Sequence, residues 1–299
     1  MRLPTFIKTF LSRTQVHNNN DMIQIDHLDF GYPGSKHQVF GDFSLTLHES
    51  NIYGLFGKNG TGKSTLLYLL CGLLRAKRGT ILVDGKAAGK RQPDMLRDIF
   101  LIPEEFELPN VKLSTYVDIN RGFYPLFSQQ VLDSCLRDFE LPISLRLGEL
   151  SMGQKKKVYM SFALATGTRL LLMDEPTNGL DIPSKSLFRK VVAKNMTDDR
   201  TLIISTHQVH DVESLIDHVV VINQSQLLLD ASVNDICDRY TFGYRPASAM
   251  DDSVLYAEPT LQGNAVVARR SEGDPETPLN LELLFNALVS EGSKLHDNR

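Results

Sequence analysis

Gly57–Ser64 reads GKNGTGKS and fits the pattern GxxxxGK[ST] of a phosphate-binding loop. It follows a strand-like apolar run, Ile52–Phe56, and opens a helical pattern over Thr65–Leu74. Glycines allow a tight turn in which backbone N–H groups and the helix N-terminus point at bound phosphates. Lys63 adds a positive charge, and Ser64 adds a hydroxyl that can bind magnesium. This context predicts a site for ATP and Mg²⁺. The residues expected to contact the phosphates are Gly57, Asn59, Gly60, Thr61, Gly62, Lys63, Ser64 and Thr65.

Short apolar strands alternate with helical patterns through most of the chain, which is typical of an α/β fold with a mainly parallel sheet. The β-rich runs are Ile52–Phe56, Leu170–Met173, Leu202–Ser205 and Val219–Ile222. Each is followed by a loop with polar residues or glycine. Because ligands bind at the carboxyl ends of strands in such folds, we expect the functional residues there.

Two segments depart from this alternation. Residues 93–165 are mostly helical and indicate a helical subdomain inserted into a main domain of residues 22–240. The helices expected in it are Leu113–Asn120, Ser128–Phe139 and Gly153–Ala165. Residues 241–299 form a small C-terminal extension, irregular in glycines and prolines until a helix expected over Leu281–Val289.

The composition is that of a folded protein: of 299 residues, 42% are hydrophobic and 23% charged, with a net charge of -4. There is no basic footprint, so we expect no nucleic-acid partner. The scattered Cys71, Cys135 and Cys237 indicate ordinary thiols in a reducing compartment. No apolar run reaches the roughly 18 to 20 residues that cross a bilayer.

Residues 1–21 form an N-terminal extension. Apolar and basic side chains alternate in it before a run of asparagines, and it lacks the cleavage site of a signal peptide. Two interpretations stay open: a peripheral amphipathic turn, or a start codon assigned too far upstream. Met22 begins the first strand-like pattern.

A pair of carboxylates, Asp174 and Glu175, follows the apolar run Leu170–Met173. Solvated acids rarely follow such a buried strand, which favours a functional pair over two surface acids. Asp174 is expected to hold magnesium or its water shell, and Glu175 to activate the attacking water.

Leu150–Gln154 reads LSMGQ and precedes a helical run that begins with three lysines. A serine there is also a common helix N-cap. The segment lies between the phosphate loop and the strand that ends in Asp174, and it resembles the LSGGQ signature of ATP-binding-cassette (ABC) proteins. Met152 replaces the usual middle glycine. The chain is thus similar to ABC transporter ATPase subunits, and among these to bacterial exporter types.

Further segments follow the cassette order. Pro176–Asp181 resembles the segment that ends in the D-loop, His207 resembles the catalytic switch histidine, and Tyr32 resembles the aromatic residue that stacks on adenine. Taken singly, Tyr32 could be a core residue and His207 a loop histidine. The resemblance implies a P-loop NTPase core with a mainly parallel sheet, an inserted helical subdomain and an N-terminal antiparallel β part.

The resemblance also implies a dimer, a homodimer or a heterodimer, in which two cassettes pair head to tail around two ATP molecules. Ser151, Gly153 and Gln154 of one subunit are then expected to contact the ATP held by Lys63 of the other. The N-terminus of the signature helix would face the γ-phosphate.

One position departs from the family pattern. The family usually has a glutamine after the strand that leads into the helical subdomain, where this chain has Glu104. A carboxylate can still coordinate magnesium, but it adds negative charge near phosphate. Glu104 is therefore a candidate magnesium ligand, with a solvated acid as the open alternative.

The function implied is ATP hydrolysis that drives a separate membrane-spanning permease, with the chain cytoplasmic and peripheral at the inner face of the membrane. The alternative is a soluble cassette ATPase, for example in iron–sulfur assembly. Retention of both Lys63 and Glu175 favours hydrolysis over nucleotide binding without turnover.

Overall fold

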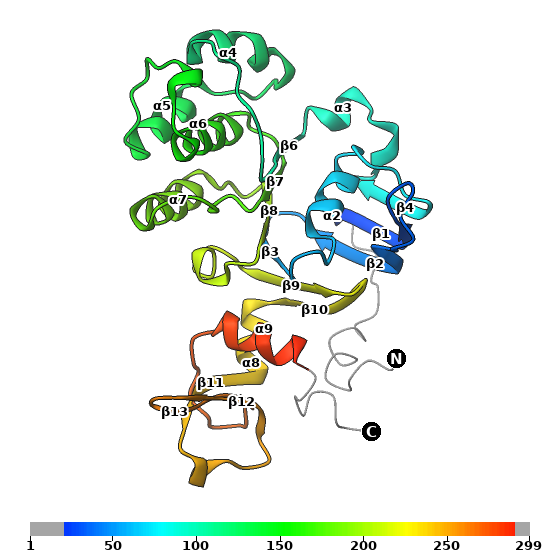
Figure 1. Cartoon of the computed structure of the whole chain (residues 1–299), viewed down its shortest axis with the longest axis vertical. Helices are drawn as coiled ribbons and strands as arrows, with labels where there is room; N and C mark the ends of the chain where they lie inside the picture. The colour runs from blue at the N-terminus through cyan, green and yellow to red at the C-terminus, as the bar shows by residue number, and fades with distance from the viewer. Residues whose placement is uncertain (1–20, 291–299) are drawn as a thin grey trace.

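The computed structural model describes residues 21–290 (Figure 1). The proposed amphipathic turn near the N-terminus lies outside these residues. The first strand begins at Asp21, one residue before the expected start at Met22.

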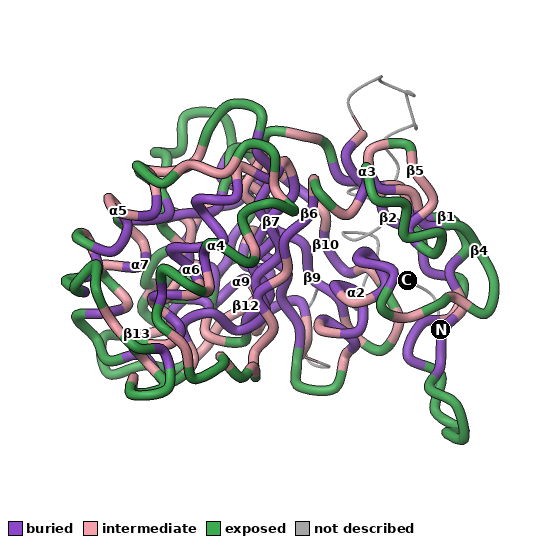
Figure 2. The backbone as a smooth tube through the Cα atoms, turned by 90° about the horizontal axis from the view of Figure 1, so that it is seen from above, coloured by how far each residue is buried: buried purple, intermediate pink, exposed green. Residues whose placement is uncertain are grey.

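A six-stranded sheet in the order β10-β9-β3-β8-β7-β6 forms the centre of the molecule. Its strands are β3 (Ile52–Phe56), β6 (Ile99–Ile102), β7 (Leu170–Asp174), β8 (Thr201–Thr206), β9 (His218–Asn223) and β10 (Gln226–Ser232). All neighbouring strands are parallel except β9 and β10. Strands β7 (Figure 2) and β8 are buried throughout, as expected of a parallel sheet covered on both faces. The mainly parallel sheet is confirmed.

The predicted antiparallel β part is also confirmed, as a four-stranded sheet in the order β2-β1-β4-β5. Its strands are β1 (Asp21–Phe30), β2 (Phe40–His48), β4 (Arg78–Val83) and β5 (Lys86–Ala87). The sheet lies beside helix α2 (Lys63–Leu70) and the short helix α3 (Pro93–Leu96) (Figure 1).

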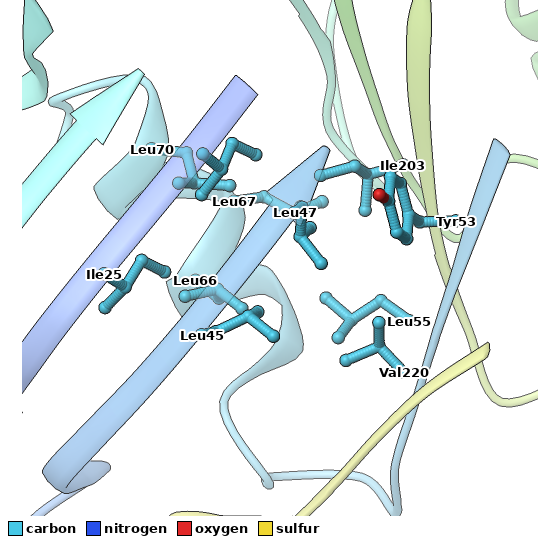
Figure 3. A pocket seen from close by; sticks show the side chains of 11 residues that line it. Ile25, Leu45, Leu47, Tyr53, Leu55, Leu66, Leu67, Leu70, Ile203 and Val220 are labelled. Carbon is cyan, nitrogen blue, oxygen red and sulfur yellow. The ribbon is translucent and has the colours of Figure 1, made fainter. Parts of the chain in front are cut away.

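Apolar side chains from β1, β2, β3 and α2 meet between this sheet and the central one (Figure 3). Only about 10 Å³ stays empty among them, so the packing is tight. The hydroxyl of the buried Tyr53 accepts from His48 N at 2.8 Å and donates to His48 O at 3.0 Å. This core fixes the start of α2, and with it the phosphate loop.

Helix α2 is shorter than the expected Thr65–Leu74: it ends at Leu70. Gly72 has a φ of +67° and the helix cannot continue through this left-handed conformation. The expected C-terminal end was wrong because the apolar residues continue past the last helical turn.

Helices α4, α5 and α6 form a separate layer beyond the β6 edge of the sheet (Figure 1). The helices from α3 to α7 are α3 (Pro93–Leu96), α4 (Leu113–Asn120), α5 (Gln129–Asp138), α6 (Met152–Ala165) and α7 (Ile182–Asn195). Strand β6 belongs to the central sheet although it falls within the range 93–165. The helical layer therefore starts after β6 rather than at residue 93.

The region after residue 240 is not irregular, and that expectation was wrong. It holds a three-stranded antiparallel sheet in the order β11-β13-β12, followed by helix α9 (Figure 1). Helix α8 (Val233–Arg239) leads into this region, whose elements are β11 (Tyr240–Arg245), β12 (Val254–Thr260), β13 (Gly263–Arg269) and α9 (Leu281–Val289). Glycine and proline lie within or beside these strands, as in Gly243 and Pro259, and they obscured the pattern.

Among the described residues, no helix has the length and apolarity needed to cross a membrane. The three cysteines are free and buried, as ordinary thiols would be.

Candidate active site

The phosphate loop connects β3 to α2 and packs so closely that side chains are excluded from parts of it. A Cβ at Gly57 would lie 2.5 Å from the carbonyl oxygen of Ile222, and Gly62 has a φ of +101°. Lys63 is buried, and its Nζ donates to the carbonyl oxygen of Gly57 at 2.8 Å. The close packing at Gly57 and the hydrogen bond from Lys63 to Gly57 therefore hold the two ends of the predicted loop together.

Burial lowers the pKa of Lys63, and the carboxylates of Glu175, Asp174 and Glu104 oppose this shift. These three acids come from the ends of β6 and β7, next to the loop. The site thus has one buried cation on the phosphate side and three carboxylates facing it.

Asp174 ends β7 opposite Ser205 of β8 and is 1% exposed. Neither carboxylate oxygen has a hydrogen-bond partner with good geometry, although the hydroxyls of Ser64 and Ser205 lie nearby. Burial raises its pKa, although the hydroxyls of Ser64 and Ser205 act in the other direction. A buried carboxylate without partners is costly unless a ligand supplies them.

These donors fit magnesium. Mg²⁺ prefers oxygen ligands and usually takes one or two from a protein, with the rest from water and phosphate. Asp174 offers two free oxygens, and Ser64 offers a hydroxyl close by. Within residues 21–290 no group of three or more histidine, cysteine, aspartate or glutamate side chains could hold a metal ion.

Glu175 directly follows β7 and is held by the end of β8. Its Oε1 accepts from the backbone N of His207 at 3.0 Å and lies 2.8 Å from His207 Nδ1, while its Oε2 accepts from Thr206 Oγ1 at 2.8 Å. Glu175 has a φ of +45°, a strained conformation for a residue with a side chain. The structure thus joins the two residues predicted to be catalytic, Glu175 and His207.

Tyr32 follows β1 and lies beside the first turn of α2. Its hydroxyl is 3.0 Å from Thr65 Oγ1, and its ring meets Phe30 edge-on with the centroids 5.1 Å apart. The residue is 41% exposed, so part of the ring is free beside the loop. It is not a core residue, which was one of the two interpretations.

The signature segment forms the start of α6, with Ser151 as the N-cap. Gln154 N donates to Ser151 Oγ at 3.3 Å, and Ser151 N donates to Gln154 Oε1 at 3.0 Å, which is a capping box. A Cβ at Gly153 would lie 3.8 Å from Leu180 Cδ2. The described contacts of this segment run to the D-loop segment of its own chain, and none runs to Lys63.

Glu104 lies just after β6, where its Oε1 accepts from Asn178 Nδ2 at 2.9 Å. Lys156, on α6, donates to the carbonyl oxygens of Asn178 at 2.7 Å and Glu175 at 3.3 Å. It is 6% exposed. Lys156 is one of three lysines in a row, and no local pattern distinguishes the buried one from its neighbours.

Helix α9 also contacts the segment that follows His207. Glu213 Oε1 accepts from Leu281 N at 2.7 Å, and His210 Nε2 is 2.6 Å from Glu282 Oε2. Phe285 of α9 lines a cavity of about 270 Å³ with Asn59 of the loop, His207 and others. Contacts over such sequence separations leave no local pattern.

Replacing Glu213 by Ala is expected to loosen α9, because a carboxylate near a helix N-terminus stabilises it by about 1 kcal/mol. We expect Tm to fall by about 2–4 °C in a thermal unfolding experiment. Glu272→Ala, at an exposed acid of the same C-terminal region, is the control. Equal shifts for the two variants would contradict the role given to Glu213.

Comparison with known proteins agrees with this arrangement. Residues 40–178 match the family model described as ABC transporter. The ABC transporter ATP-binding protein YtrB of Bacillus subtilis (strain 168) is 30% identical over 223 residues, which are 73% of this chain and 75% of that protein. The chain belongs to the ABC transporter ATP-binding family.

Two further matches support membership of the ABC family. The zinc uptake system ATP-binding protein ZurA of Listeria innocua serovar 6a is 27% identical over 72% of this chain and 88% of that protein. A solved structure described as the ATP-binding subunit of an ABC transporter has a TM-score of 0.65 at 25% identity, covering 72% of this chain and 91% of that chain. The chain is thus an ABC ATP-binding subunit, and the family is one of ATPases.

Proposed function

We propose that this ABC subunit hydrolyses MgATP and that the reaction drives a separate membrane permease. The observation that carries the proposal is that Lys63, Asp174 and Glu175 lie together at the carboxyl ends of the central strands β3 and β7. Lys63 is buried in the phosphate loop, Asp174 has two unpartnered oxygens, and Glu175 is fixed by hydrogen bonds. These are the parts that phosphoryl transfer to water needs.

Each residue has a separate task. The loop N–H groups and Lys63 hold the phosphates and neutralise their charge. Asp174 and Ser64 would hold magnesium, which when bound supplies positive charge to the phosphate oxygens. Glu175 orients and polarises the attacking water, and His207 and Thr206 keep the carboxylate in place.

A second cassette completes the site in this proposal. The side-chain hydrogen bonds of Ser151 and Gln154 stay within the signature segment, and Ser151 is at the exposed N-terminus of α6. A helix N-terminus attracts anions, so this end suits the γ-phosphate held by a partner subunit. ATP binding should therefore favour dimers.

The permease is the third part of the proposal, and it places the chain on the cytoplasmic face of a membrane. Family membership supports coupling to transport, and the relatives named above give no support to the soluble iron–sulfur alternative. One of them is named for zinc uptake, so the exporter direction stays a prediction.

The test is the release of phosphate from ATP by the purified chain over a range of protein concentrations. We expect a rate per subunit that rises with protein concentration, because two subunits form the site, and that vanishes with EDTA. Absence of hydrolysis by the purified chain at every protein concentration, with Mg²⁺ present, would contradict the proposal.

Tyr32 provides a test of the adenine site. Tyr32→Ala is expected to weaken ATP binding by about 1–3 kcal/mol, the range for a base stacked on an aromatic ring. Tyr32→Phe should have a small effect, because it removes only the hydrogen bond to Thr65 Oγ1. Isothermal titration with ATP measures both. Equal losses would mean that the hydroxyl, and not the ring, matters.

A further inference from the structure

The buried amino group of Lys156 is surrounded by backbone carbonyls and acids of the active site. Its Nζ donates to Asn178 O at 2.7 Å and Glu175 O at 3.3 Å. Burial lowers the pKa of Lys156, and the carboxylates of Glu104, Glu175 and Asp174 oppose this, with Glu104 the largest of the three effects. A buried ammonium group is costly unless it is paired, and here these groups pair it.

Asn178 connects the lysine to Glu104. Its backbone carbonyl accepts from Lys156, and its side-chain Nδ2 donates to Glu104 Oε1 at 2.9 Å. Three elements meet there: the residues after β6, the start of α6 and the turn after β7. Glu104 is half-buried there, and its carboxylate is the nearby charge with the largest effect on Lys156.

The turn after β7 needs support because it carries a strained residue. Glu175 has a φ of +45°, and its carbonyl oxygen accepts from both Asn178 N at 3.1 Å and Lys156 Nζ. Strained backbone at a functional site persists only where its surroundings hold it. The orientation of the Glu175 carboxylate follows from this turn.

We propose that Lys156, Asn178 and Glu104 form one charge-balanced unit that positions Glu175, with Lys156 as its positioning residue. The inference rests on the proposed ATPase function. Lys156 does not reach the reacting atoms; it fixes the backbone of the residue that does. The positive charge of Lys156 is required because Glu104 is an acid. Replacing both residues by neutral ones should therefore restore the charge balance.

The test is a double-mutant cycle in the full-length chain with Glu104→Gln, Lys156→Gln and the pair. Lys156→Gln should lower kcat for ATP about tenfold or more while the KM for ATP changes less than about threefold. The double variant should return to within about threefold of the parent kcat. Lys155→Gln, at the neighbouring half-buried lysine, is the control and should stay within about twofold of the parent.

Thermal unfolding of the same variants gives a readout independent of activity. Lys156→Gln should lower Tm by about 5–10 °C, because it leaves the half-buried Glu104 without its cation, and adding Glu104→Gln should recover most of this loss. Additive effects of the two substitutions on both kcat and Tm would contradict the proposal that Lys156, Asn178 and Glu104 act as one unit. Recovery of Tm without recovery of kcat would overturn the positioning of Glu175. A parent without ATPase activity would instead overturn the proposed function, and the Tm cycle would still decide the charge balance.

Discussion

Replacing Glu175 by Gln is expected to lower ATP turnover by about 10²–10⁴-fold, the usual contribution of a general base, while ATP binding is retained. Glutamine has nearly the same shape, so the contacts to Thr206 and His207 can largely persist. What is lost is the carboxylate that polarises the attacking water. With hydrolysis blocked, ATP should accumulate in the site and hold two subunits together.

Two measurements check this result. Phosphate release gives the turnover, and size-exclusion chromatography with MgATP gives the dimer. Glu107→Gln, at an exposed acid after β6, serves as the control and should match the parent in both. A Glu175→Gln chain that hydrolyses ATP at the parent rate would falsify the role of Glu175.

Lys63→Ala should impair the binding of ATP rather than the activation of water. Removing one partner of a buried charge pair typically costs about 2–5 kcal/mol, so ATP affinity should fall by at least roughly 30-fold. The loss also removes one of the two buried lysines near Asp174, Glu175 and Glu104. No nucleotide-dependent dimer should form.

Isothermal titration with ATP and Mg²⁺ measures the affinity, and circular dichroism verifies that the variant is folded. Lys90→Ala, at an exposed lysine of the 3-10 turn η1 (Ala88–Lys90), is the control. An affinity for ATP within a few-fold of the parent would mean that the loop backbone alone holds the phosphates. Together, the two variants separate binding from water activation.

The elements that position the site were predictable because their signals are local. The runs Ile52–Phe56, Leu113–Asn120 and Leu281–Val289 were expected with the bounds that the structure gives them. The other strands are longer than expected, β7 by one residue at one end and β8 and β9 by one residue at each end. A strand in a buried parallel sheet needs a continuous apolar run, and a polar residue ends it. Such constraints act within a few residues of the chain.

The C-terminal sheet was missed for the same physical reason. Strand β12 contains Pro259, and β11 contains Gly243, two residues that weaken a strand pattern. These strands are stabilised by pairing with β13, as in Phe242 opposite Val267. Pairing across the sheet outweighs local preference there, and a sequence window does not contain it.

The sequence by itself determined the family, the phosphate loop, the order of the motifs and the carboxylate pair, because each depends on residue type at a fixed local spacing. The tertiary structure alone decided which polar groups share a buried space. It placed Lys156 among the acids of the site, joined Glu175 to His207 and brought Phe285 to the loop. These partners are 19 or more residues apart in the chain, and their contacts arise from the packing of whole elements. The free-energy cost of burying a charge depends on the groups around it, and these groups come together only when the chain folds.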